Sequence, residues 1–281
     1  MTSSKNIIAF GGAPGSYADL ACRSVFPDDA TLPCLGFEEA FAAVREGKAD
    51  RAMIPVDNAI AGRVADVHHL LPQGGLHIVG EHYQAVEHHL LALPGAKLAD
   101  LKTVKSHVQG LSQCRRFIHQ HGLRPEAENN TAQAAANLAA QQDKTTGVIA
   151  SALAGQIYGL ESLAQNIADR SGNTTRFLIL EQKPAQPAPT QPCVTSLIFR
   201  VRSVPAALYK ALGGFATNGV NITKLESYLV DGNFTAAQFY LDLDGHPDTV
   251  PMRHALEELG FFAHEVTILG TYPAHPFRMI G

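Results

Sequence analysis

The stretch K-P-A-Q-P-A-P-T-Q-P, residues 183–192, divides this sequence into two parts. It holds four prolines and shows no apolar periodicity, which is typical of a stiff, extended spacer and not of a packed element. We therefore predict a large domain over residues 5–182, a linker over residues 183–193 and a small domain over residues 194–273.

The small domain is expected to have the element order βαββαβ, which is the order of a ferredoxin-like unit. Alternating apolar side chains predict its four strands, at residues 197–201, 221–230, 239–243 and 264–269. Apolar side chains at helical spacing predict its two helices, at residues 208–216 and 252–259. The turn residues Asp231, Gly232 and Asn233 should join the second and third strands into a hairpin.

In the large domain, short apolar runs alternate with segments of helical period, which indicates crossover connections and mostly parallel sheets. The expected strands are residues 7–10, 52–56 and 103–105, and the expected helices are residues 17–26, 37–44, 63–71, 107–121 and a segment after Thr131. A longer β-rich stretch, residues 76–93, should carry the chain into a second lobe, and residues 175–180 should return it. We therefore predict an α/β protein with two lobes around a cleft for a small molecule.

Composition argues against several classes of partner. Hydrophobic residues make up 46% of the sequence, enough for a core, and the formal net charge of -4 leaves no broad cationic surface for nucleic acid. Residues 1–6 are followed by too short an apolar segment for a signal peptide, and no stretch approaches the roughly 18 apolar residues of a membrane span. The cysteines are widely scattered, which favours a reducing cytoplasm over a disulfide framework or a thiolate zinc site.

The histidines and serines form no recognisable metal or acyl-transfer motif. His68-His69 and His88-His89 are adjacent pairs whose side chains diverge, and neither H-x-x-x-H nor H-E-x-x-H occurs. The G-x-S-x-G elbow of serine hydrolases is absent as well. We expect no catalytic metal and no cofactor.

Two segments in the first third of the chain have candidate binding groups. In G-G-A-P-G-S, residues 11–16, backbone N–H groups and a helix N-terminus can hold an anion, or Ser16 simply caps the helix after a tight turn. The segment matches neither G-x-G-x-x-G nor a P-loop, which disfavours nucleotide binding. In P-V-D-N-A-I-A-G, residues 55–62, Asn58 can donate and accept hydrogen bonds in a cleft, or form an Asx-type turn.

Two further segments lie at later junctions between elements. In K-S-H-V-Q-G, residues 105–110, Ser106 and Gln109 fit a capping box, and His107 is either a proton donor or a solvated residue at a helix start. In N-T-T-R-F, residues 173–177, Arg176 offers a bidentate fork to a carboxylate, and the Thr175 hydroxyl both donates and accepts. A β-branched residue that opens a strand is also ordinary propensity.

Taken together and in this order, these segments and the C-terminal unit resemble prephenate dehydratase with a C-terminal ACT regulatory domain. The resemblance covers about residues 7–272. Its most specific pieces are T-R-F at residues 175–177, as in the family, and S-H-V-Q-G-L-S-Q-C at residues 106–114, which is similar to the family's S-H-P-Q-A-L-x-Q-C.

The sequence departs from the family pattern at a few positions. Val108 and Gly110 stand where the family has Pro and Ala, and D-N-A at residues 57–59 stands where it usually has E-N-S, so Ala59 lacks a hydroxyl. In the C-terminal unit, P-A-A-L at residues 205–208 resembles P-G-A-L, whereas E-S-Y-L at residues 226–229 replaces E-S-R-P.

The resemblance implies a periplasmic-binding-protein-like catalytic domain that converts prephenate to phenylpyruvate, with loss of carbon dioxide and the ring hydroxyl, in phenylalanine biosynthesis. It implies that Thr175 bonds the departing hydroxyl and that Arg176 binds a substrate carboxylate. The other substrate contacts that we expect are Asn58, Ser106, His107, Gln109, Gly15 and Ser16. A proton source is left open between His107, Glu81 and a bound water.

The resemblance also implies regulation and self-association. Phenylalanine would bind at the interface of paired ACT domains, near Leu208, Asn218, Val220 and Asn221, in a homodimer or homotetramer. Two alternatives stay open: an arogenate dehydratase, because Ala59 replaces a hydroxyl residue, and a non-catalytic ligand-binding protein, because two lobes around a cleft also describe solute receptors.

Overall fold

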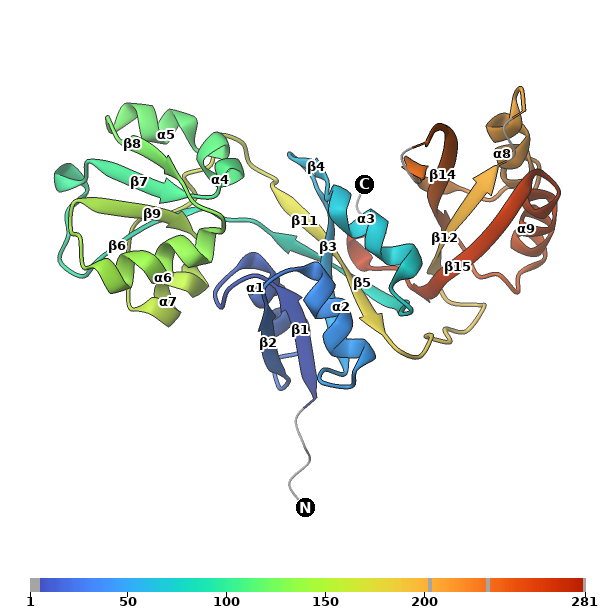
Figure 1. The fold of residues 1–281 in the computed structure, drawn as a ribbon, viewed down its shortest axis with the longest axis horizontal. Coiled ribbons are helices and arrows are strands. Elements are labelled where there is room, and N and C mark those ends of the chain that lie inside the picture. Colours follow the sequence, from blue (N-terminus) through green and yellow to red (C-terminus); the bar gives the residue numbers. More distant parts are fainter. Residues whose placement is uncertain (1–5, 202–203, 231–232, 280–281) are drawn as a thin grey trace, which may run out of the picture. The chain divides into compact units, whose positions relative to one another are not determined.

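The computed structural model describes residues 6–201, 204–230 and 233–279, and Figure 1 shows its helices and strands. These residues build three sheets. Among them, no helix combines the length and the apolar character that crossing a bilayer requires. By contacts, the chain divides into a first unit, Met1–Val67 with His82–Phe177, and a second unit, His68–Glu81 with Leu178–Gly281.

The first sheet has the strand order β2-β1-β3-β11-β5, and a short strand, β4, pairs with β3. Its strands are β1 Ile7–Gly11, β2 Ala30–Cys34, β3 Arg51–Asn58, β4 Gly62–Arg63, β5 His77–Ala85 and β11 Thr174–Glu181. Strand β1 runs parallel to both β2 and β3. The helices that follow these strands are α1 Tyr17–Val25, α2 Phe37–Arg45 and α3 Ala65–Leu70, and the last continues into the 3-10 turn η1 Leu71–Gln73.

Helical spacing explains why α1 and α2 pack on this sheet. In α2, Ala40, Phe41 and Val44 recur at the spacing of one helix face, and all three are buried. Strand β5 passes from the second unit into the first and β11 from the first unit into the second, so each strand connects the two units covalently.

The second sheet belongs to the first unit and has the order β10-β6-β9-β7-β8. Its strands are β6 His89–Ala92, β7 Thr103–Ser106, β8 Arg124–Ala127, β9 Thr146–Ala150 and β10 Glu161–Ala164. Its helices are η2 Leu98–Asp100, α4 Val108–Gln113, α5 Arg115–Gln120, α6 Thr131–Gln141 and α7 Ala152–Tyr158. Strand β7 pairs in parallel with β8 and β9, whereas β6 pairs antiparallel with β9 and β10, so this sheet is mixed and not mostly parallel as predicted.

Alternation along β6 explains why both faces of the second sheet are covered. Leu90 contributes to the core under α4 and α5, whereas Leu91 contributes to the core under α6 and α7 (Figure 1). The single helix predicted over residues 107–121 is in fact two helices, because Cys114 has φ -122° and ψ 25°, outside the helical range.

The third sheet is antiparallel and has the order β13-β14-β12-β15. Its elements are β12 Cys193–Val201, α8 Ala207–Thr217, β13 Ile222–Val230, β14 Asn233–Asp244, α9 Val250–Phe262 and β15 Ala263–Pro273, followed by η3 Pro276–Met279. The predicted order βαββαβ is therefore the observed order. Of the predicted turn, Asp231 and Gly232 lie outside the described residues. The proline-rich segment between β11 and β12 carries neither helix nor strand.

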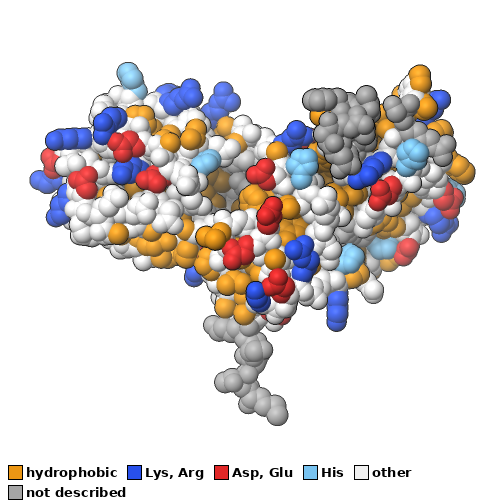
Figure 2. Space-filling view, viewed as in Figure 1, with side chains coloured by type: hydrophobic (Ala, Val, Ile, Leu, Met, Phe, Trp, Pro, Cys, Tyr) orange, Lys and Arg blue, Asp and Glu red, His pale blue; other side chains and the backbone are white. Residues whose placement is uncertain are grey.

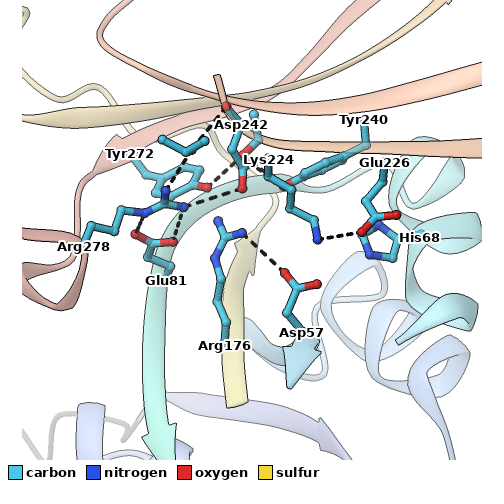
Figure 3. Close-up of polar contacts among 12 residues, drawn as sticks. Asp57, His68, Glu81, Arg176, Lys224, Glu226, Tyr240, Asp242, Tyr272 and Arg278 are labelled. Carbon is cyan, nitrogen blue, oxygen red and sulfur yellow. Dashed lines mark hydrogen bonds and ion pairs between the residues drawn. The ribbon is translucent and has the colours of Figure 1, made fainter. Parts of the chain in front are cut away.

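Both helices of this C-terminal part pack on one face of its sheet. Phe215 of α8 and Leu259 of α9 join Leu197, Phe199 and Leu241 of the strands in a single core. The polar network on the sheet includes Asp242, whose Oδ1 accepts from the Ser196 and Tyr240 hydroxyl groups (Figure 3).

The remainder of the second unit packs against this domain through specific contacts. The Tyr228 hydroxyl lies 2.7 Å from His68 Nδ1, and a Cβ atom on Gly270 would overlap the Ile78 carbonyl. Arg278 binds Glu81 through two nitrogens, at 2.6 and 2.9 Å (Figure 3). Residues 68–81, which the sequence places in the large domain, thus contact the C-terminal part, and residues 77–81 also belong to β5 of the first sheet.

Charge is mixed over the visible surface. On the face drawn in Figure 2, basic and acidic side chains are interspersed over the described residues. This distribution agrees with the small net charge of -4 and offers no continuous basic stripe on that face.

Candidate active site

Two neighbouring strands of the first sheet carry consecutive polar residues, Asp57-Asn58 on β3 and Thr175-Arg176 on β11. Successive side chains of a strand point to opposite faces, so each dipeptide divides its groups between the two faces. On one face, Asn58 Nδ2 donates to Thr175 Oγ1 at 2.9 Å. On the other, Arg176 Nη1 lies 3.7 Å from Asp57 Oδ2 (Figure 3).

The Asn58 amide has one possible orientation. Its Oδ1 accepts from the backbone N–H groups of Ile60, at 3.0 Å, and Ala61, at 2.8 Å. Because a backbone N–H can only donate, the Nδ2 hydrogens must point the other way, to Thr175 Oγ1 and to Asn173 Oδ1 at 2.8 Å. The Thr175 oxygen is thus an acceptor for Asn58, and its own hydrogen remains available to a further acceptor.

The same hydrogen-bond direction continues away from Thr175. Asn173 Nδ2 donates to Gln113 Oε1 at 2.9 Å, and Gln113 Oε1 lies 2.7 Å from His88 Nε2, which must therefore carry a hydrogen. Burial lowers the pKa of His88, which favours the neutral ring. The Tyr17 hydroxyl lies 2.8 Å from His88 Nδ1 and donates its hydrogen to the Glu87 carbonyl at 2.8 Å. Side-chain amides do not readily pass protons along, so this chain of contacts orients Asn58 and does not feed it a proton.

The glycine-rich turn has a packing role. Gly15 has φ +85°, its N–H donates to Asp19 Oδ2 at 2.8 Å, and its carbonyl accepts from the Ser151 hydroxyl. Ser16 is buried and caps α1 by accepting from the Asp19 N–H. The groups that were expected to bind substrate at Gly15 and Ser16 are used within the protein, because the turn closes against α7.

The segment before α4 also differs from the capping box that the sequence suggested. The Ser106 side chain is fully buried and donates to the Ile149 carbonyl at 2.6 Å, so it is not the helix cap. His107 is the cap, and its Nδ1 accepts from the Gln109 N–H at 3.3 Å. A Cβ atom on Gly110 would lie 2.8 Å from Ser106 Oγ, which explains why glycine suits this position.

A cavity of about 320 Å³ lies beside this hydrogen-bond network. Its lining is Ile60, Ala61, Gln109, Ser112, Gln113, Arg115, Ala168, Asp169 and Arg170. The sequence identified Gln109 as a candidate, and the structure places it here with an exposed side chain. The sequence marked Gln113 only as part of the motif at residues 106–114. It did not predict Arg115 or Arg170 as lining residues, because neither arginine belongs to a motif.

Two expectations about charge need correction. Thr175 and Arg176 do not meet at one anion, since they lie on opposite faces of β11 and Arg176, only 6% exposed, is paired with Asp57. Glu81 is not a suitable proton source, because its buried carboxylate is held by Arg278 and by the His275 N–H.

The four candidate effector residues lie around α8 and the start of β13. Leu208 is at the beginning of α8 and packs against the core of its domain, whereas Asn218 caps the other end of the helix and donates to Glu258. Val220 donates its N–H to Phe215, and Asn221 donates its side-chain amide to Asp244 at 2.8 Å. Leu208 and Asn218 thus lie at opposite ends of α8, and the binding of an effector near these four residues stays a prediction.

Among the described residues, no group of three or more histidine, cysteine, aspartate or glutamate side chains is placed to hold a metal ion. The polar groups gathered near Thr175 are amides, hydroxyls and an imidazole. Such a set donates and accepts hydrogen bonds at fixed positions, which suits a reaction governed by proton position and developing negative charge.

The model of the prephenate dehydratase family matches residues 8–185. This chain belongs to the prephenate dehydratase family. A protein of Komagataeibacter europaeus, named as a bifunctional N-acyl-homoserine lactone acylase/prephenate dehydratase, is 50% identical over 98% of both chains. The arogenate dehydratase/prephenate dehydratase 1 of Arabidopsis thaliana is 38% identical over 96% of this chain and 72% of its own length.

Among solved structures, the prephenate dehydratase of Arthrobacter aurescens in complex with L-Phe superposes with a TM-score of 0.88 at 28% identity. The match covers 95% of this chain and 90% of that one. A second structure, described as a novel type of quorum quenching acylase, has a TM-score of 0.92 at 50% identity and covers 97% of this chain. Membership of the prephenate dehydratase family thus extends over both the catalytic and the C-terminal parts.

Proposed function

We propose that this protein converts prephenate to phenylpyruvate in phenylalanine biosynthesis, with Thr175 as the group that assists loss of the ring hydroxyl. The observation that carries the proposal is the fixed direction of the bond from Asn58 to Thr175, at 2.9 Å. Because Thr175 Oγ1 accepts there, its hydrogen can point to the departing oxygen of a bound substrate.

The chemistry needs no change in oxidation state of the protein. The bond between the ring and its carboxylate breaks, carbon dioxide leaves, and the electron pair makes the ring aromatic as the carbon–oxygen bond to the hydroxyl breaks. The departing hydroxide takes one proton and becomes water. The Thr175 hydroxyl stabilises the negative charge that develops on this oxygen, which is the type of interaction that accelerates a reaction most.

A threonine hydroxyl is too weak an acid to lose its proton for good, so another group must restore it. Glu81 is committed to Arg278, which leaves His107 and water. His107 is half-buried at the start of α4, and its Nδ1 accepts from the Gln109 N–H, so its Nε2 carries the exchangeable proton.

We further assign residues 5–182 to the two-lobed, periplasmic-binding-protein-like catalytic domain and residues 194–273 to an ACT domain that binds phenylalanine. The βαββαβ order and the L-Phe complex of the Arthrobacter relative support this assignment. Binding at a pair of ACT domains implies a homodimer or homotetramer, and we expect the enzyme in the cytoplasm.

Arogenate, which has an amino group where prephenate has a keto group, is the alternative substrate. Relatives at 38% identity carry arogenate dehydratase in their names. The ratio of kcat/KM for the two compounds decides between them, and we expect prephenate to be preferred because the Komagataeibacter relative, at 50% identity, is named for it.

The test is turnover by the purified full chain. We expect prephenate to yield phenylpyruvate at a rate that depends on enzyme concentration, and phenylalanine to slow the reaction. Tight binding of prephenate without turnover would instead support a ligand-binding protein. A rate that phenylalanine leaves unchanged would reject the regulatory assignment alone.

Hydrolysis of N-acyl-homoserine lactones is a second candidate function, because a relative 50% identical over 98% of both chains is named for it. Its nucleophile should not be a thiol, since all four cysteines are buried and burial raises the pKa of Cys114 to about 12. Ser162 Oγ lies 3.1 Å from His89 Nδ1, and burial lowers the pKa of His89, which keeps the ring neutral and able to accept a proton.

The Ser162→Ala variant tests this second candidate. Wild-type protein that releases the acyl chain and a variant that does not would support Ser162 as nucleophile. If the variant releases the acyl chain as fast as the wild type, this pair is not the site, and if the wild type releases no acyl chain, the activity is absent.

A further inference from the structure

The cavity beside Gln113 contains two guanidinium groups with no protein partner among the described residues. Arg115 and Arg170 both line it and both are exposed, and neither makes a hydrogen bond or an ion pair there. The neighbouring Arg116 differs, because its Nε lies 3.6 Å from Asp169 and its N–H donates to the same carboxylate. The Asp169 charge is thereby compensated, so the cavity has an excess of positive charge.

The break between α4 and α5 explains how this lining arises. Residues two apart on a continuous helix point to different faces, so Gln113 and Arg115 would diverge. The non-helical Cys114 ends α4 and starts α5 in a new direction, which allows both side chains to line the same cavity. The break at Cys114, which periodicity does not reveal, thus places the Arg115 guanidinium beside Gln113 in the cavity wall.

The cavity and the Thr175 hydroxyl depend on the same supporting residues. Gln113 lines the cavity and binds Asn173 at 2.9 Å, and Asn173 binds Asn58, which holds Thr175. Ile60 and Ala61, whose N–H groups fix the Asn58 amide, line another part of the wall. The residues that line the cavity are therefore connected by direct hydrogen bonds, through Asn173 and Asn58, to the Thr175 hydroxyl.

The substrate of the proposed reaction is a dianion, and it needs cations that Arg176 does not supply on the Thr175 face. We propose that Arg115 and Arg170 form a carboxylate-binding subsite for this substrate. Guanidinium groups suit the role because two parallel N–H groups match two carboxylate oxygens. The volume of about 320 Å³ is at the lower end of the range for small-molecule sites, as a compact diacid requires. The inference rests on the proposed function.

The experiment measures KM and kcat for prephenate in Arg115→Gln, in Arg170→Gln and in the double variant. We expect each single change to raise KM about tenfold or more, the size of a lost charged hydrogen bond, and kcat to change less than about threefold. Arg124→Gln is the matched control, because it removes the same charge at a position outside the cavity. Arg124 is exposed on β8 and is paired with Glu126. The KM of this variant should stay at the wild-type value.

Arogenate provides a second readout, because it keeps both carboxylates of prephenate. The two arginine variants should therefore raise KM for arogenate by the same factor as KM for prephenate. Binding of prephenate by calorimetry, in a Thr175→Ala background, gives the same comparison without turnover. A double variant whose KM and Kd stay within about twofold of the parent value overturns the subsite, whether or not the chain is active. If the wild type converts neither compound, the proposed function fails, and the Kd values still judge the subsite.

Discussion

Asn58 determines what the Thr175 hydroxyl is free to do. Its oxygen is held by two backbone N–H groups and its nitrogen donates to Thr175, so the threonine hydrogen is directed elsewhere. Of the two interpretations that the sequence suggested for Asn58, the turn is observed, because Oδ1 accepts from the Ile60 and Ala61 N–H groups. Its role in substrate binding stays a prediction.

The change Asn58→Asp reverses this direction with almost no change in shape. An aspartate keeps the acceptor for Ile60 and Ala61 but places a second acceptor opposite Thr175, which would then donate its hydrogen to the protein. We expect kcat for prephenate to fall about 10²-fold, as is typical when a proton-transfer group is lost, with a small change in KM.

A double variant provides the control for this prediction. If Asn58 acts through Thr175, adding Asn58→Asp to Thr175→Ala should lower kcat little further, because the hydroxyl is already gone. Fully multiplicative effects, or a normal kcat in Asn58→Asp alone, would show that the orientation of Thr175 does not limit the rate.

Residue-level reasoning from the sequence located several site positions but not their grouping. Thr175 and Asn58 are together as expected, whereas Arg176 is on the other face of its strand. Strand periodicity alone predicts that separation, since neighbours in a strand point apart. His88 and Asn173 joined the network through contacts far apart in sequence, which no local pattern reveals.

Among the elements, the glycine-rich turn before α1 shows how closely two parts of the first unit approach. A Cβ atom on Gly15 would lie 2.7 Å from Ala154 Cα of α7, and the residue has φ +85°. We expect Gly15→Ala to lower the free energy of unfolding by about 3 kcal/mol or more, because backbone strain and overlap both contribute.

Gly47→Ala is the matched variant for this prediction, since Gly47 has φ +72° but no atom lies within 4 Å of the position that a methyl group would take there. It should cost only the backbone strain, about 1 to 2 kcal/mol. Chemical denaturation compares the two, and equal losses would mean that the approach to α7 contributes nothing.

Most elements follow from local periodicity, and the exceptions have a physical reason. The apolar stripe of Leu111, Cys114, Phe117 and Ile118 continues at helical spacing through the break at Cys114, so periodicity alone predicts one helix. A single non-helical residue changes direction without changing that spacing.

At the scale of the whole molecule, residues 68–81 join the C-terminal domain in one unit, although they precede half of the large domain in sequence. Arg278 contributes to this grouping by binding Glu81 at 2.6 Å, and it lies 3.5 Å from Asp242 (Figure 3). Contacts between residues so distant in sequence leave no periodic signal, so periodicity along the sequence does not reveal this grouping.

The change Arg278→Gln removes the cation that two fully buried carboxylates, Glu81 and Asp242, share. Removal of one partner of a buried pair typically costs about 3 to 5 kcal/mol. We therefore expect a loss of that order in the free energy of unfolding, measured by chemical denaturation. Arg253→Gln, at an exposed position of α9, should change stability by less than about 0.5 kcal/mol, and a similarly small loss in Arg278→Gln would contradict a structural role.

The whole account depends on one hydroxyl group that is positioned to donate to the oxygen that leaves prephenate. The most direct measurement is the kcat of Thr175→Ala with prephenate, beside Thr175→Ser, which keeps the hydroxyl. We predict a loss of about 10²-fold or more in the alanine variant, an unchanged unfolding midpoint, and a much smaller loss in the serine variant. A folded alanine variant with near-normal kcat would contradict the account.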